Sequence, residues 1–304
     1  MYDVVIVGGG PAGLVSAVYA LRGGRSVVVI EKNGFGGQIA FSPKVENIPG
    51  TIQISGAEFA DKLVEQVVNL GADLELEKVT EIKKEDGIFY VYTEEGNTFE
   101  GKTVILALGV KHRMLGLEGE EELVGRGVSY CAVCDGAFYH GRRVAVVGGG
   151  DTALQDALFL SATCAHVTLI HRRDQFRGEE KLVRQLQGCK NVDILLSHVP
   201  VSLESLDGEL RGVALRDLKT GAEFNLPVEG LFLAVGQEPH NGQFADLIRL
   251  TAGGYVDAGE DCRTNVPGVF VAGDCRVKEV RQLTTAVGDG AVAALAACKY
   301  VDSL

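Results

Sequence analysis

The sequence predicts an α/β protein with two βαβ units, and two observations lead to this fold class. First, the segments "VVIVGGGPAG" and "VAVVGGGDTA" have the same shape and begin at residues 4 and 144. Second, each continues through a helix-like segment into another β-branched run, "SVVVIEK" or "HVTLIHRR". An apolar strand, a glycine turn, a helix and a return strand form a βαβ unit. We therefore expect two Rossmann-like dinucleotide-binding domains with a three-layer architecture.

The composition of the 304 residues is that of a globular protein of roughly two domains. Hydrophobic residues make up 46%, charged residues 23%, and the mean hydropathy is +0.14. A formal net charge of −12 argues against a general nucleic-acid binder. No apolar run approaches the ~20 residues that a membrane span needs, and we expect no leader before "YDVVIVGGG". We expect a cytoplasmic protein without a membrane segment.

The first glycine turn has the full GxGxxG pattern at Gly8, Gly10 and Gly13. Such a pattern alone is also found in tight turns that bind nothing. Here, however, Glu31 ends the next apolar run, at the position where a carboxylate accepts hydrogen bonds from ribose hydroxyls. We expect Gly10 to allow a pyrophosphate to approach the backbone at the start of the following helix.

The second turn has Gly148 and Gly150, with Ala153 in place of the third glycine, a variant that the same pattern allows. His171 occupies the position that corresponds to Glu31. The acid has thus been replaced by the start of a basic run, which is completed by Arg172, Arg173 and Arg177.

A basic run of this kind favours a phosphorylated ribose. Guanidinium groups can bind a 2′-phosphate through paired hydrogen bonds, whereas a carboxylate would repel it. The first turn therefore suits FAD and the second suits NADPH. The alternative is that "HRRDQFR" is only a solvated face.

The C-terminal part adds a further strand and helix in "GVFVAGDCRVKEVRQLTTAVGDGAVAALAA". Asp274 follows the strand and could hold a ribitol hydroxyl, and the next helix could direct its N-terminus at a flavin ring.

Two of the seven cysteines, Cys131 and Cys134, lie three positions apart in "CAVCDG", and Asp135 follows them directly. An odd cysteine count argues against a framework of structural disulfides. A zinc site needs four ligands, and no second CxxC or HxxxH-type pair exists. A buried inert pair is the other alternative. We interpret the motif as a redox centre, because CxxC spacing allows disulfide exchange and a neighbouring acid can transfer a proton.

With these motifs in place, the chain resembles the low-molecular-weight, NADPH-dependent thioredoxin reductases of bacteria and archaea. The resemblance rests on "GGGPAG", "GGQ", "VEN", "CAVCDG", "GGGDTA", "HRRDQFR", "GVFVAGD" and "RQ", which occur in family order along nearly the whole chain. It implies a discontinuous FAD-binding domain, residues 1–112 and 243–304, into which an NADPH-binding domain of residues 113–242 is inserted. The family implication is that the two domains rotate relative to one another.

The resemblance also implies roles for individual residues. Cys134 would face the flavin, Cys131 would attack the disulfide of thioredoxin, and Asp135 would supply the proton. The motif "GGGDTA" adds Asp151 and Thr152 to the expected NADPH contacts. The expected FAD contacts outside the glycine turn are Gln38, Asn47, Asp274, Arg281 and Gln282.

Three positions depart from the family pattern: Leu108 replaces a threonine, His240 replaces an asparagine, and Gln155 stands where an acid is common. A homodimer and a thioredoxin-like partner are implied by the resemblance. The alternatives are a ferredoxin-dependent relative, a reductase for another small disulfide protein, and a non-enzymatic redox sensor.

Overall fold

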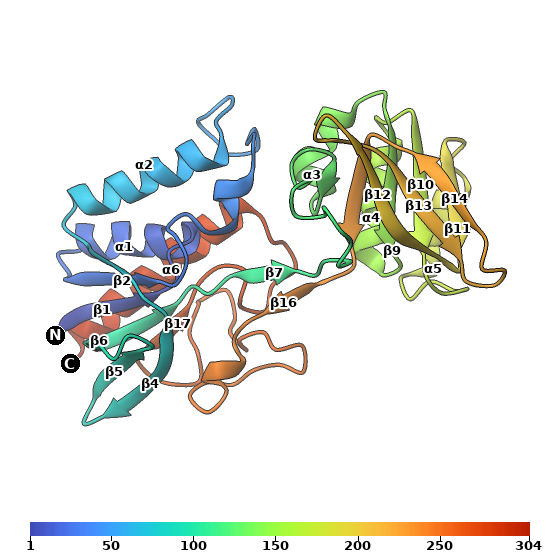
Figure 1. The fold of residues 1–304 in the computed structure, drawn as a ribbon. Coiled ribbons are helices and arrows are strands. Elements are labelled where there is room, and N and C mark those ends of the chain that lie inside the picture. The colour runs from blue at the N-terminus through green and yellow to red at the C-terminus, as the bar shows by residue number, and fades with distance from the viewer. The chain divides into compact units, whose positions relative to one another are not determined.

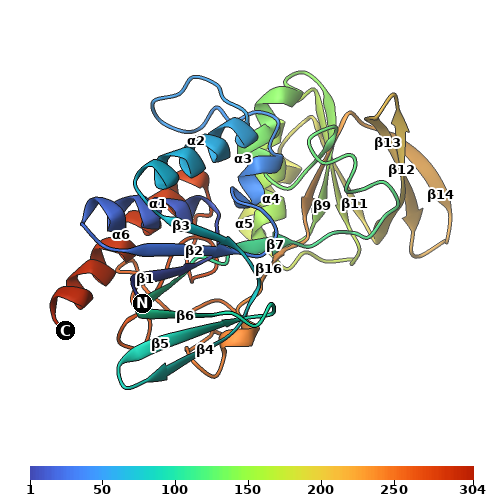
Figure 2. The ribbon, with the colours of Figure 1, turned by 60° about the vertical axis from the view of Figure 1, so that its left-hand side comes forward.

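The computed structural model describes residues 1–304, which form two compact units (Figures 1 and 2). The first unit consists of Met1–Lys111 and Glu238–Leu304, and the second is His112–Gln237. The second unit is therefore inserted into the first along the chain. The chain passes between them at β7 (Val110–His112) and β16 (Gln237–Pro239), which pair as a two-stranded sheet.

The chain returns to the first unit after Gln237, and the resemblance implied a domain boundary after residue 242. Asn241 lies between these two positions. Its side-chain amide donates hydrogen bonds to the backbone oxygens of Gly254 (2.9 Å) and Cys275 (2.8 Å), and the residue is fully buried. These bonds tie the segment after β16 to the first unit.

The first unit contains a mixed sheet in the order β3-β2-β1-β6-β5-β4, with β17 also paired to β6. The strands β1, β2, β3, β6 and β17 pair in parallel, while β4 and β5 are antiparallel. The strands are β1 (Tyr2–Val7), β2 (Val27–Glu31), β3 (Asp73–Leu76), β4 (Val79–Glu85), β5 (Ile88–Thr93), β6 (Thr98–Leu106) and β17 (Val269–Val271).

Three helices cover one face of this sheet, as Figure 1 shows. They are α1 (Pro11–Arg22), α2 (Gly56–Asn69) and α6 (Leu283–Asp302), and two 3₁₀ turns, η1 (Gly37–Phe41) and η3 (Gly242–Phe244), lie in the loops. Strand β1 is apolar from Val4 to Val7 because both of its faces are buried there. Val4 and Ile6 pack in the core that contains the helices, and Val5 and Val7 pack in a second core with β4 and β5.

The second unit has three layers. Its central sheet is wholly parallel, in the order β11-β10-β9-β15-β8. One face carries helices and the other carries an antiparallel sheet of three strands, so both faces of β9 are buried. The elements are β8 (Val128–Ser129), α3 (Ala132–Asp135), η2 (Gly136–Tyr139), β9 (Arg143–Gly148), α4 (Asp151–Ser161), β10 (His166–His171), α5 (Glu180–Gln187), β11 (Val192–Leu196), β12 (His198–Leu206), β13 (Glu209–Asp217), β14 (Glu223–Pro227) and β15 (Gly230–Ala234).

The predicted α/β fold class is confirmed, and the repeated unit is visible in the backbone. Gly10 and Gly150 are the N-cap residues of α1 and α4. In the first unit the amide of Gly36 donates to the oxygen of Gly9 (2.8 Å), and in the second the amide of Arg177 donates to the oxygen of Gly149 (2.8 Å). Each glycine turn is thus closed by the loop after the next strand. No helix combines the length and apolar character that a bilayer crossing requires.

We expect Gly13→Ala to lower the free energy of unfolding by about 2–3 kcal/mol, because overpacking a tight contact forces the backbone to shift. A Cβ atom at Gly13 would lie 1.9 Å from the oxygen of Gly8. Gly10→Ala is the matched control, since a Cβ there has no neighbour closer than 3.9 Å. Urea unfolding of the ligand-free chain measures both, and equal stability of the two variants would contradict the expectation.

Candidate functional site

Cys131 and Cys134 form a disulfide, with their Cα atoms 5.3 Å apart. Cys131 is the N-cap of α3, and Cys134 lies within the helix on the surface of the second unit. The Sγ atom of Cys131 accepts a hydrogen bond from the backbone N–H of Cys134 (3.2 Å). Once the disulfide is opened, this N–H would stabilise a thiolate on Cys131, because a donor directed at the sulfur favours its charged form.

Asp135 lies directly after the pair and is linked back to it by Ser129. The Ser129 hydroxyl donates to Oδ2 of Asp135 (2.6 Å), and its oxygen accepts the backbone N–H of Cys131 (3.1 Å). Burial raises the pKa of Asp135, and the bond from Ser129 acts in the opposite direction. A carboxyl group with a raised pKa next to two sulfurs can act as a proton donor.

Sequence reasoning missed Ser129. The signal was its position two residues before Cys131, at the end of β8, where a short polar side chain can reach the start of a following helix.

The disulfide argues against the zinc alternative. A zinc ion would need both cysteines as thiolates, and their sulfurs are bonded to each other. No group of three or more histidine, cysteine or acidic side chains is arranged to hold a metal ion. The remaining five cysteines are free thiols: Cys164, Cys189, Cys262, Cys275 and Cys298.

In the first unit, the glycine turn opens onto a cavity of about 440 Å³. Gly8, Glu31, Leu108 and His240 are among the residues that line it, so two of the departures from the family pattern lie here. The carboxylate of Glu31 is held by the backbone N–H of Gly9 (2.7 Å), which bonds to Oε2. This arrangement leaves lone pairs of Glu31 for ribose hydroxyls.

Three predicted FAD contacts lie in the loops of the same unit. Gln38, in η1, donates from its side chain to the backbone oxygen of Val110. Asn47 donates from Nδ2 to Oε1 of Gln282 (3.2 Å), although 235 residues separate them in sequence. Gln282 is the N-cap of α6 and forms a capping box with Thr285. The structure therefore brings Asn47 and Gln282 together at the start of α6.

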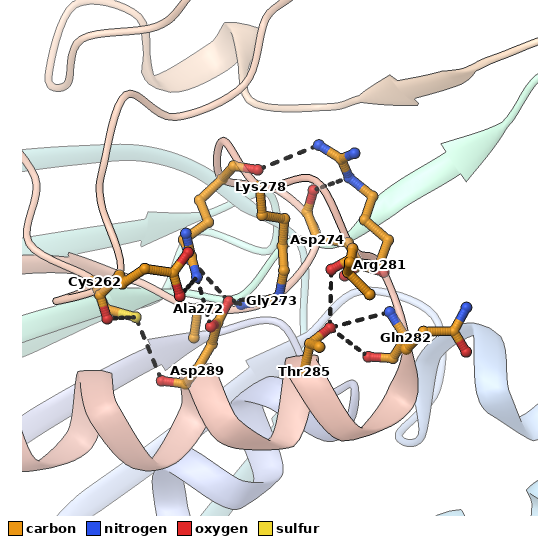
Figure 3. A network of polar contacts seen from close by, with 12 residues as sticks. Cys262, Ala272, Gly273, Asp274, Lys278, Arg281, Gln282, Thr285 and Asp289 are labelled. Atoms are coloured by element: carbon orange, nitrogen blue, oxygen red, sulfur yellow. Dashed lines mark hydrogen bonds and ion pairs between the residues drawn. The ribbon is translucent and has the colours of Figure 1, made fainter. Parts of the chain in front are cut away.

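Asp274 lies at the turn after β17, next to Arg281 (Figure 3). Burial raises the pKa of Asp274, while the charges of Lys278 and Arg281 oppose this effect. Its Oδ1 atom is buried and has no hydrogen-bond partner in the protein. The Nε atom of Arg281 donates to the backbone oxygen of Asp274 (3.3 Å). A buried acceptor without a partner fits a ligand that carries hydroxyl groups, because such an atom is costly to leave unpaired.

In the second unit, His171 lies directly beside the glycine turn. A Cβ atom at Gly149 would be 2.1 Å from Cε1 of His171, so only glycine allows this contact. The imidazole Nε2 bonds to the backbone oxygen of Gln175 (3.1 Å), and the ring stacks on Phe176 at 5.4 Å. Burial lowers the pKa of His171, and the neighbouring arginines add to the effect. His171 is therefore a neutral, packed residue that shapes the turn.

The basic run presents three exposed guanidinium groups near this turn, and none of the three forms an ion pair: Arg172, Arg173 and Arg177. The Asp151 carboxylate already has a partner within the protein, since its Oδ1 accepts the backbone N–H of Glu179 (2.7 Å). Thr152 and Gln155 are exposed on α4. Gly150 has open space where its Cβ would lie. The turn and the unpaired arginines can together bind a phosphorylated dinucleotide.

A surface disulfide in a unit with one glycine turn, joined to a unit with a second such turn, defines a dinucleotide-dependent disulfide oxidoreductase. Residues 2–290 match the family model described as pyridine nucleotide-disulphide oxidoreductase. The chain belongs to this family and, within it, to the thioredoxin reductases.

Individual relatives are similar to the chain over its full length. The chain is 42% identical to thioredoxin reductase of Treponema pallidum (strain Nichols) over 306 residues, covering 100% of this chain and 98% of that protein. It is 38% identical to thioredoxin reductase of Bacillus subtilis (strain 168), with coverage of 100% and 96%. The crystal structure of thioredoxin reductase from Streptococcus pyogenes MGAS5005 matches with a TM-score of 0.95 and 39% identity, covering 100% and 99% of the two chains.

Proposed function

We propose that this chain is a thioredoxin-disulfide reductase that passes electrons from NADPH through FAD and the Cys131–Cys134 pair to the disulfide of thioredoxin. The observation that carries this proposal is the disulfide itself, with Cys131 Sγ accepting the Cys134 N–H. FAD and NADPH, when bound, supply the two electrons that convert the disulfide to a dithiol. The family relationship over the full chain supports the same reaction.

The two sulfurs have different tasks in this proposal. Cys131, stabilised as a thiolate by the Cys134 N–H, attacks one sulfur of the thioredoxin disulfide. A mixed disulfide forms, and the other thioredoxin sulfur leaves as a thiolate that takes up a proton. Cys134 then attacks Sγ of Cys131, which restores the disulfide within the chain and releases thioredoxin as a dithiol. Cys134 would be the sulfur through which FAD, when bound, reduces the pair.

Asp135 supplies the proton in this scheme. Burial raises its pKa, which favours the protonated carboxyl group, and the Ser129 hydroxyl fixes its orientation at 2.6 Å. The residue is adjacent to Cys134 in the chain, so a proton can reach a thiolate without a separate relay.

The cofactor contacts follow from the two units. We assign FAD to the first unit, with its pyrophosphate at Gly10, its ribose at Glu31 and its ribitol at Asp274, whose unpaired Oδ1 suits a hydroxyl donor. Gln38, Asn47, Arg281 and Gln282 complete this set. We assign NADPH to the second unit, with the pyrophosphate at Gly150 and the 2′-phosphate at the basic run.

The free space at the second glycine turn favours NADPH over ferredoxin as the electron donor. A ferredoxin-dependent relative does not need a turn that binds a nucleotide. In this chain, however, there is open space at the Cβ position of Gly150, and the three arginines of the basic run have no acidic partner. A non-enzymatic redox sensor would pass few electrons to any disulfide, so turnover separates it from the reductase.

We place the protein in the cytoplasm, because five free thiols suit a reducing compartment.

We also propose a homodimer, the commonest assembly of soluble proteins. The first unit exposes apolar side chains on its outer helices, with Tyr19 of α1 43% and Leu295 of α6 52% exposed. Sedimentation velocity at micromolar concentration tests this proposal, and a monomer mass would contradict it.

The central test is Cys131→Ser. We expect this variant to bind FAD and to be bleached by NADPH under anaerobic conditions, but to lose thioredoxin turnover by more than about 10³-fold, because the attacking sulfur is gone. The wild-type protein should give repeated turnover in the same assay. Cys189→Ser, which removes a free thiol of the same unit, should keep full activity. Full thioredoxin turnover by Cys131→Ser would show that the roles are wrongly assigned.

Replacing Arg172 and Arg173 together by alanine should raise KM for NADPH by about 10- to 100-fold and leave KM for NADH nearly unchanged, since only NADPH has the 2′-phosphate that these groups bind. Steady-state kinetics with both nucleotides measures the effect. The matched control is Lys181→Ala with Arg184→Ala, which removes two positive charges from α5 of the same unit. An equal rise in KM for NADH would rule out a specific phosphate contact.

A further inference from the structure

Three ionised side chains are buried together behind the turn that carries Asp274, and we call them the Asp289 cluster: Arg276, Lys278 and Asp289 (Figure 3). Their side chains are 1%, 4% and 8% exposed, respectively. Oδ1 of Asp289 accepts Nη2 of Arg276 (2.8 Å), and Oδ2 accepts Nε of Arg276 (2.8 Å) and Nζ of Lys278 (3.0 Å). Sequence reasoning missed this cluster.

Asp289 also holds the backbone of the turn. Its Oδ2 accepts the N–H of Gly273 (3.0 Å), and Gly273 directly precedes Asp274. Gly273 has φ +82°, which favours glycine, and a Cβ there would lie 2.8 Å from the Cβ of Ala12 in α1. The two oxygens of Asp289 therefore accept four hydrogen bonds, all from the segment between β17 and α6.

Arg276 extends these connections toward the other predicted FAD contacts. Its backbone oxygen accepts Nη2 of Arg281 (3.5 Å), whose Nε bonds to the backbone oxygen of Asp274 (3.3 Å). The guanidinium of Arg281 lies over the ring of Tyr255, 4.3 Å from its centroid. A change at Asp289 would therefore be transmitted through the backbone of this segment to Asp274, which Arg281 also contacts.

We propose that Asp289 is a positioning residue for flavin binding: it fixes the Gly273–Asp274 turn so that the Asp274 carboxylate is presented to the ribitol chain of FAD. This inference rests on the proposed function. Asp289 acts through the turn and does not itself touch the cofactor.

The character of the cluster supports a positioning role. Buried ion pairs are often no more stabilising than apolar side chains of the same size, because both ions lose their hydration. The cluster instead fixes the geometry of the backbone, because four hydrogen bonds from three residues to one carboxylate define the path of the turn. Helix α6 is otherwise built of small and apolar residues at its buried positions, and Asp289 is its one buried charged residue.

The test measures the dissociation constant of FAD by fluorescence titration of the FAD-stripped full chain. We expect Asp289→Asn to raise it about tenfold, since an asparagine offers one acceptor oxygen where the carboxylate accepts four hydrogen bonds. Asp274→Ala should raise it by at least as much. The double variant Asp274→Ala with Asp289→Asn should bind FAD no more weakly than Asp274→Ala alone, because Asp289 acts through Asp274.

Glu260→Gln is the matched control. Glu260 contacts the same arginine, with Oε2 3.0 Å from Nη2 of Arg276, but its side chain is 87% exposed. The variant makes the same change of charge and should bind FAD like the wild type. An unchanged dissociation constant for Asp289→Asn, or additive losses in the double variant, would overturn the positioning role.

A fold defect is separated from a binding defect by circular dichroism of the FAD-stripped variants. Should Asp289→Asn fail to fold, Lys278→Met serves instead, since it keeps the pair of Arg276 and Asp289 and removes one donor. In the wild-type background, Lys278→Met should raise the dissociation constant of FAD about threefold, and in the Asp274→Ala background it should leave that constant unchanged. A dissociation constant equal to that of the wild type would overturn the inference. Absence of FAD binding by the wild type, or no effect of Asp274→Ala, would overturn the proposed FAD site and the positioning role together.

Discussion

The close approach of a helix to a glycine turn is the constraint on which the rest of the structure depends. A Cβ at Gly13 would lie 1.9 Å from the oxygen of Gly8, and a Cβ at Gly8 would lie 2.3 Å from the oxygen of Ala107. The absence of these side chains lets α1 begin directly at the end of β1 and lets β6 pass beneath the turn. The free N–H groups of the helix then face the place where a phosphate can bind, and the same arrangement is repeated at α4.

The redox pair depends on a different kind of geometry, because its chemistry is local. Cys131, Cys134, Asp135 and Ser129 come from one short segment that runs from β8 through α3. A helix that begins at Cys131 brings the Cys134 N–H to the sulfur, and the Ser129 hydroxyl lies between the Asp135 carboxylate and the backbone of Cys131. The residues proposed to contact FAD, in contrast, come from distant segments. Gln282 at the start of α6 is bonded to Asn47, and the buried Asp289 of the same helix is bonded to Gly273.

Local patterns predicted the α/β class, both glycine turns and the cysteine motif correctly, because strand, turn and helix signals lie within a few residues of each other. The boundary at residue 237 and the Asp289 cluster could not be predicted in this way. Asn241 is held by Gly254 and Cys275, and Asp289 by residues 11 to 16 positions away, so neither partner can be inferred from sequence periodicity. The only sequence signal for Asp289 was one acid among the small residues of "AVGDGAVAALAA".

The sequence by itself determined which residues can carry the chemistry: two cysteines at disulfide spacing, two turns that only small residues allow, and a basic run where the first unit has an acid. Only the tertiary structure decided how these groups are held. It paired Asn47 with Gln282 across 235 positions, buried the carboxyl group of Asp274 with one oxygen unpaired, and placed a carboxylate from α6 behind it. The physical reason is that side-chain type is a local property, whereas burial and hydrogen-bond partners are set by segments that meet only when the sheets and helices pack.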